Sequence, residues 1–279
     1  MIMIDSAFSI GAMHQICEDY AITGMYPLPY LIICDGCSGS PQTDVGARIL
    51  AHAAANTLGV LYASPEVNDQ VVGYEEFGLE TIQRAARATQ RLHLHLHCLD
   101  ATLIVCFVVK DTVIIYMYGD GVVVIKQREL NALLSFETQY DNNRPFYLSY
   151  RLNEGRYNEY YSTIVGEENG IKNKQEISNV IGEPLDANVR VAFNEPWQTS
   201  MPIEEVEFIA IGSDGITQMT NKAGIFQYTP DEIQQLCAFK VTKGQFVKRR
   251  LKRFLETRKR QEITNRDDIS LAVLYCQED

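Results

Sequence analysis

The sequence predicts an α+β fold, a layered α-β-β-α sandwich of two mainly antiparallel sheets flanked by helices. Three observations lead to this prediction. The middle of the chain consists of short runs rich in β-branched and aromatic residues, joined by links too short for parallel crossovers. These runs are apolar almost throughout, so each face of a strand needs a covering layer. Segments with helical periodicity lie before and after them and can supply the outer layers.

Strands are predicted where an apolar run is bounded by turn residues. The central pair flanks Lys110-Asp111, a two-residue link that fits an antiparallel hairpin. The next run follows Gly119-Asp120-Gly121, a tight-turn signal, and is predicted to continue the same meander. In chain order, the predicted strands are one beginning at Tyr20, then 31–34, 102–109, 112–118, 122–126, 206–212 and 269–276.

Helices are predicted where apolar residues recur at intervals of three and four. This periodicity occurs in 42–58, in 75–92, in 231–239 and within 243–258. The third helix is expected to begin at Asp231, an N-cap residue that follows Pro230. These helices are the candidates for the covering layers of the sandwich.

Residues 1–279 are predicted to form a single domain. Between about 138 and 200 the composition shifts towards Asn, Glu, Tyr and Gly, and the periodicity is weak. We interpret this segment as a flap-like excursion from the core.

Composition excludes several classes of protein. The formal net charge of −11 argues against a general nucleic-acid binder, because most of the surface would repel phosphate. No apolar run approaches the roughly 20 residues that cross a bilayer, and the first residues lack a basic leader region. The seven cysteines are scattered, so no disulfide framework is expected. We therefore expect a cytoplasmic protein without a nucleic-acid or membrane partner.

Acidic residues recur next to the ends of the predicted strands. They are Glu18-Asp19, Asp35, Asp120, Asp214 and Asp267-Asp268. Strand ends of a sandwich share a rim, where convergent carboxylates repel one another unless cations neutralise them. Carboxylate oxygens suit Mg²⁺ or Mn²⁺, and a glycine after Asp35 lets its carbonyl approach a metal. Any one Asp-Gly pair alone is more often a simple turn.

The order of these motifs resembles the metal-dependent type-2C protein Ser/Thr phosphatases, the PPM family, in their bacterial form. The resemblance runs from about residue 10 to residue 276. The matching motifs are HQICED at 14–19, DGCSG at 35–39, YGDG at 118–121, GSDGI at 212–216 and RDDISLAVL at 266–274.

This resemblance implies a protein Ser/Thr phosphatase that acts on a phosphorylated protein and opposes a Ser/Thr kinase in signalling. It also implies two Mg²⁺ or Mn²⁺ ions bridged by Asp35, whose shared water would attack phosphorus in line. The metal ligands that it implies are Glu18, Asp19, Asp35, Gly36, Asp214 and Asp267, with Glu18 and Asp19 binding directly or orienting waters. Asp35 and His14 are the implied catalytic residues.

Five positions or short segments depart from the family pattern, including Cys37, where some members have a proposed general-acid His, and LDAT at 99–102, where the family has Gly-Ser-Thr. His14 stands where the family has a phosphate-binding Arg; it can hold phosphate but lacks the bidentate fork of a guanidinium. Gln218 replaces an acidic residue, which argues against a third metal near Asp120, and Asp268 replaces the usual Asn. These departures leave open an alternative function, a catalytically weak phosphatase-like module that binds a phosphoprotein or signalling partner.

Other features have competing interpretations. Cys34 and Cys37 have C-x-x-C spacing, but a thiol oxidoreductase usually places a helix N-terminus behind such a motif. The histidines at 93, 95 and 97 could bind zinc, and we favour ordinary partly exposed residues. The basic segment 248–260 is either the solvated face of an amphipathic helix or a docking face for phosphorylated or acidic partners.

Overall fold

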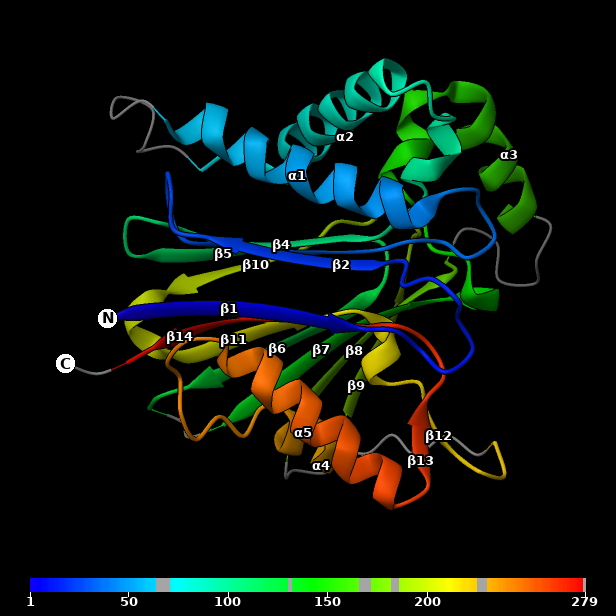
Figure 1. Cartoon of the computed structure of the whole chain (residues 1–279). Helices are drawn as coiled ribbons and strands as arrows, with labels where there is room; N and C mark the ends of the chain where they lie inside the picture. Colours follow the sequence, from blue (N-terminus) through cyan, green and yellow to red (C-terminus); the bar gives the residue numbers. More distant parts are fainter. Residues whose placement is uncertain (64–70, 130–131, 166–171, 182–185, 225–229, 278–279) are drawn as a thin grey trace.

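The predicted layered class is confirmed by the computed structural model, which describes residues 1–63, 71–129, 132–165, 172–181, 186–224 and 230–277. Two sheets pack face to face, and helices lie outside both of them (Figure 1). Every strand pair within these sheets is antiparallel. None of the described helices is long and apolar enough to cross a membrane.

The larger sheet has seven strands and the smaller one has five. The seven-stranded sheet runs in the order β1 (Ile2–Ser9), β14 (Ile269–Cys276), β11 (Val206–Gly212), β6 (Gly121–Gln127), β7 (Leu133–Tyr140), β8 (Lys174–Val180) and β9 (Asp186–Val191). The five-stranded sheet runs β10 (Trp197–Pro202), β5 (Thr112–Tyr118), β4 (Leu103–Val109), β3 (Tyr30–Asp35) and β2 (Asp19–Gly24). A separate ribbon pairs β12 (Met219–Asn221) with β13 (Ile263–Asn265).

Helices cover the outer face of each sheet, as the apolar strands require. They are α1 (Thr43–Tyr62), α2 (Tyr74–Arg91), α4 (Pro230–Leu236) and α5 (Phe246–Arg260), while α3 (Glu154–Val165) belongs to the segment 138–200. Helices α1 and α2 pack on the five-stranded sheet, where Leu50 and Phe77 share a buried cluster with Phe107. Helices α4 and α5 cover the seven-stranded sheet, with Leu251 in the cluster around Phe208. The third apolar layer fills the space between the sheets.

The predicted meander ends one strand early. The hairpin of β4 and β5 forms as expected, but β6 pairs with β11 and β7 in the opposite sheet. Gly119 and Gly121 have φ values of +95° and +140°, so the turn redirects the chain instead of folding it back. The crossing leaves Asp120 buried between the two sheets at their common rim.

The segment 138–200 contributes to both sheets. Strands β8 and β9 extend the seven-stranded sheet, and β10 forms an edge of the five-stranded one. Helix α3 packs through an aromatic cluster in which Phe146 and Phe193 meet edge to face at 4.9 Å between ring centroids. The tyrosines of the segment 138–200 therefore serve in part as a local core.

We expect Gly46→Ala to lower the free energy of unfolding by about 3 kcal/mol, because helix α1 approaches the chain at Cys98 with no room for a side chain. A Cβ at Gly46 would lie 1.6 Å from the carbonyl oxygen of Cys98. Gly59 lies on the same helix with nothing within 4 Å of its Cβ position. Gly59→Ala should therefore raise stability by about 0.5–1 kcal/mol. Urea unfolding measures both variants, and equal effects would contradict this account of the packing.

Candidate metal centre

Strand ends from both sheets bring the predicted carboxylates to one rim. Asp19 begins β2 and pairs directly with Asp35 at the end of β3. Asp214 follows β11, and Asp267 precedes β14, which lies beside β11 in the other sheet. Asp120 reaches the same rim from the turn after β5. The sequence prediction that carboxylates at strand ends converge is therefore met for these residues.

The carboxylates lie close enough to disturb one another's ionisation. Loss of hydration and then the charges of Asp19 and Asp214 raise the pKa of Asp35 well above its ordinary value. The pKa of Asp120 is raised well above its ordinary value, first by burial and then by the charge of Asp214. Asp267 also has a raised pKa, with burial as the largest cause. Ionised together, these groups would repel strongly.

Asp19 is the most enclosed member of the group and has an oxygen without a partner. Its Oδ2 accepts a hydrogen bond of 2.7 Å from Ser213, which in turn accepts one from the backbone N–H of Ser270. Its Oδ1 is buried and has no hydrogen-bond partner. Burial raises the pKa of Asp19 to about 7, although the Ser213 hydroxyl and Asp35 act in the opposite direction. A buried oxygen without a partner is costly unless a cation is bound to it.

Asp214 and Gly36 are positioned by their immediate neighbours. Gln218 donates a side-chain hydrogen bond to Asp214 Oδ2. Burial raises the pKa of Asp214 to about 6, and the charge of Asp267 adds to this rise. The backbone N–H of Gly36 donates to the carbonyl of Glu18 at 3.2 Å, and a Cβ at Gly36 would lie 2.8 Å from Thr43 Cβ. Only glycine lets the strand end turn so close to helix α1.

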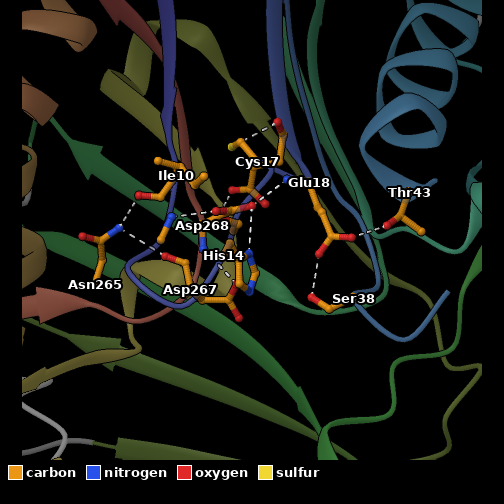
Figure 2. Close-up of polar contacts among 12 residues, drawn as sticks. Ile10, His14, Cys17, Glu18, Ser38, Thr43, Asn265, Asp267 and Asp268 are labelled. Atoms are coloured by element: carbon orange, nitrogen blue, oxygen red, sulfur yellow. Dashed lines mark hydrogen bonds and ion pairs between the residues drawn. The ribbon is translucent and has the colours of Figure 1, made fainter. Parts of the chain in front are cut away.

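Glu18 is directed towards the start of helix α1. Its two carboxylate oxygens accept hydrogen bonds from Ser38 at 2.7 Å and from Thr43 at 2.6 Å (Figure 2). Its charge still contributes to the raised pKa values of His14 and Asp267. In this arrangement both of its oxygens already have partners.

Asp268 fastens the loop that carries His14. Its carboxylate accepts backbone hydrogen bonds from Gly11 at 2.7 Å and from Glu18 at 2.6 Å (Figure 2). With 1% of its surface exposed, it is a buried charge satisfied by the loop. In the sequence, Asp268 is distinguished only as a replacement for the usual Asn. An asparagine there has one acceptor oxygen and could not accept both bonds in the same way.

His14 forms ion pairs with two neighbouring carboxylates. Its Nδ1 lies 3.1 Å from Asp268 Oδ2, and its Nε2 lies 3.3 Å from Asp267 Oδ1. Burial opposes protonation of the ring, but the contacts with Asp268 and the charge of Asp267 outweigh it and raise the pKa of His14. The imidazolium is thus held at the edge of the carboxylate group.

The competing cysteine and histidine sites gain no support. Cys34 is fully buried, and burial followed by the charge of Asp19 raises the pKa of its thiol well above the ordinary value. All seven cysteines are free. The rings of His95 and His97 stack edge to face, and the backbone N–H of His97 donates a hydrogen bond to Nδ1 of His95. His95 is exposed and His97 is partly exposed, as expected for ordinary surface residues.

The donor set at the rim fits a hard divalent cation. Within the described ranges, no three His, Cys, Asp or Glu side chains are already arranged to hold a metal ion, so carboxylates would have to rotate on binding. The residues nevertheless offer only oxygen donors, repel one another, and include the buried oxygen of Asp19 without a partner. These properties match Mg²⁺ or Mn²⁺ and not zinc.

Comparisons with known proteins extend over most of the chain. The family model described as "Protein phosphatase 2C" matches residues 12–256. The crystal structure of a bacterial serine phosphatase has a TM-score of 0.56 and 13% identity, covering 100% of this chain and 99% of that one. The S. agalactiae serine/threonine phosphatase has a TM-score of 0.56 and 16% identity, covering 99% of this chain and 100% of that one. The Mycobacterium tuberculosis serine/threonine phosphatase PstP/Ppp has a TM-score of 0.52 and 12% identity, covering 99% of each chain. No curated protein matches.

Without divalent cations, we expect the protein to lose stability as pH rises. The pKa of Asp19 is raised from 3.8 to about 7 and that of Asp214 to about 6, so the folded state retains protons that the unfolded state releases. The stability contributed by the protonated forms is present below pH 4 and lost as pH rises through about 6 to 7. Melting temperatures in EDTA should therefore fall between about pH 5 and pH 7.5, and Mn²⁺ should reduce the fall.

The matched variants are Asp19→Asn and Asp111→Asn. Asp111 is exposed in the turn between β4 and β5, so its substitution should leave the pH profile unchanged. Asp19→Asn should flatten the profile in EDTA, because the buried group no longer ionises. An unchanged slope in Asp19→Asn would contradict the electrostatic description of the rim.

Proposed function

Because the chain belongs to the protein phosphatase 2C family, whose members are protein Ser/Thr phosphatases, we propose that it hydrolyses phosphoserine or phosphothreonine esters of proteins with two Mg²⁺ or Mn²⁺ ions. One observation carries this proposal: carboxylates from both sheets crowd at one rim with raised pKa values. Asp35, Asp214 and Asp267 keep part of their surface open to solvent, so a phosphate ester has access to the same rim.

Asp35 is proposed as the ligand shared by both cations, because Asp19 and Asp214 exert the largest charge effects on it. Asp19, Gly36, Asp214 and Asp267 are proposed as the remaining ligands. Glu18 is proposed to act through the hydrogen bonds that it accepts from Ser38 and Thr43, or to orient waters. When bound, such cations neutralise the phosphate and acidify a water enough for attack on phosphorus.

His14 is proposed to bind a phosphate oxygen as an imidazolium, with the phosphate replacing Asp267 as the partner of its Nε2. Its raised pKa and its contacts with Asp267 and Asp268 favour the charged ring. Asp268 is a positioning residue here, since it fixes the backbone at Gly11 and Glu18 on either side of the histidine. A single imidazole donor holds phosphate less tightly than the fork of an arginine.

A second candidate function is a phosphatase-like module that binds a phosphoprotein with little turnover. The partners already bonded to Glu18 and to Asp214 favour it, because those hydrogen bonds compete with a cation for the same oxygens. Both candidates imply a phosphorylated Ser/Thr protein as the ligand and a Ser/Thr kinase as its source. They differ in whether Mn²⁺ confers turnover.

We expect hydrolysis of p-nitrophenyl phosphate and of a phosphoserine peptide in Mn²⁺, and none in EDTA. Asp35→Asn should lower kcat/KM at least 100-fold, because the shared carboxylate loses its charge. Asp111→Asn serves as a carboxylate control, and the Cys34→Ser/Cys37→Ser double variant should retain activity. Metal-dependent hydrolysis equal in wild type and Asp35→Asn would remove the enzyme proposal, while binding of the phosphopeptide without turnover would favour the second candidate.

His14→Ala should raise KM for the phosphopeptide about tenfold, corresponding to one charge-assisted hydrogen bond. His14→Arg should lower KM below the wild-type value, because the guanidinium forms two parallel bonds to phosphate. His52→Ala is the control, since that histidine is exposed on helix α1. Initial rates over a range of peptide concentrations separate KM from kcat, and an unchanged KM in His14→Ala would exclude the proposed contact.

A further inference from the structure

We propose that an arginine-lined pocket beside helix α5 binds the phosphate group of a phosphate monoester that also carries an apolar group. The pocket has a volume of about 360 Å³. Its lining includes Lys240, Arg249, Arg250 and Arg253, together with Phe239 and Phe246. This second anion site goes beyond the proposed phosphatase activity and does not depend on it.

Helix α5 concentrates positive charge in an otherwise acidic chain. It carries eight of the chain's 25 lysines and arginines and only one of its 36 acidic residues. Val247, Leu251 and Phe254 face the core, which leaves the basic side chains other than Arg258 on the outer surface of the helix. Arg249 and Arg253 are four residues apart and therefore adjacent on one side of it.

Two of the guanidinium groups are held in place by main-chain carbonyls. Arg249 Nη2 donates to the carbonyl of Lys243 at 2.6 Å, and Arg250 Nε donates to the carbonyl of Leu236 at 3.2 Å. Each guanidinium has five N–H donors, so these bonds restrict the side chain and leave donors for a ligand. Restricted arginines lose less entropy when they bind an anion.

The pocket gathers positive charge. No carboxylate is among its lining residues. Burial lowers the pKa of Arg250, and the positive charges of Arg253 and Arg258 lower it further, although Cys237 has the opposite effect. Arg258, on the buried side of the same helix, lies 3.3 Å from Glu232. The helix thus pairs its buried Arg258 with a carboxylate and places Arg249, Arg250 and Arg253 around the pocket.

The aromatic side of the pocket indicates what accompanies the phosphate. Phe239 packs edge to face on Phe246, with 5.4 Å between ring centroids, and Val241 is 62% exposed. A ligand with an apolar group next to its phosphate would cover this surface. Two sources share this chemistry: a phosphorylated side chain flanked by apolar residues in a protein, and a free phosphate ester of an aromatic compound.

The pocket is separate from the metal centre. Helices α4 and α5 lie on the outer face of the seven-stranded sheet, with the end of α5 next to β13 (Figure 1). Arg249 lies in the first turn of α5, about 16 Å along the helix from Arg260. A ligand held there leaves the carboxylate rim free.

We would test the site by fluorescence anisotropy, using a labelled peptide in which leucines flank a phosphoserine on both sides. The measurement is made in EDTA with the wild-type protein and again with the Asp35→Asn variant. Without cations the carboxylate rim repels phosphate, so the signal reports the arginine pocket. We expect the Arg249→Ala/Arg253→Ala variant to bind at least tenfold more weakly. The matched control is Lys252→Ala/Lys259→Ala, which removes the same charge from the other flank of α5 and should change affinity less than threefold.

The possible results distinguish the two sources of the ligand from each other and from results that would contradict the proposal. Saturable binding of AMP measured by calorimetry and lost in the Arg249→Ala/Arg253→Ala variant, without binding of the phosphopeptide, would support the site with a free ester as its ligand. The proposal is overturned by equal binding of the unphosphorylated peptide or by equal losses in the arginine and lysine variants. A single-stranded oligonucleotide that binds through both flanks of α5 would also overturn it, since the helix would then be a general polyanion surface. None of these readouts requires hydrolysis, so failure of the phosphatase proposal leaves them intact.

Discussion

The main physical constraint on this structure is the repulsion among the carboxylates that meet at one rim of the two sheets. Asp19 and Asp120 are buried there, the charge of Asp214 raises the pKa of Asp35, and the charge of Asp267 raises the pKa of Asp214. Buried like charges destabilise a fold unless protons or cations neutralise them. Neutralisation by protons or cations would therefore relieve this repulsion, an arrangement that is common at functional sites.

The sandwich makes this crowding possible because both sheets end at the same place. Antiparallel pairing sets Asp19 directly across from Asp35, while Asp267 arrives from the strand that neighbours β11. The turn after β5 carries the chain from one sheet to the other and delivers Asp120 on the way. Rigid strands, and not loops alone, thus determine where the charged groups meet.

The sequence predicted the parts of the fold that local patterns determine. Strands 206–212 and 269–276 have the predicted bounds, since turn residues punctuate them clearly. Strand β1 was missed, because a half-buried edge strand that contains Asp5 and Ser6 lacks a continuous apolar run. The partner of β6 was wrong, because a Gly-Asp-Gly turn fixes a change of direction but not which sheet follows. Convergence of Asp19, Asp35 and Asp214 could be predicted from strand ends. The hydrogen bonds between Asp268 and the distant loop at Gly11 could not be predicted, because no local pattern in the sequence indicates them.

The tie between Asp268 and the loop at Gly11 joins residues that are 257 positions apart. Ser213 and Asp19, which share a hydrogen bond in the same centre, are 194 positions apart. Contacts of such long range require the chain to close a large loop before they stabilise anything. The rim is therefore assembled only when the last strand docks beside the first. A partly folded chain can hold packed helices and a formed hairpin and still lack the centre altogether.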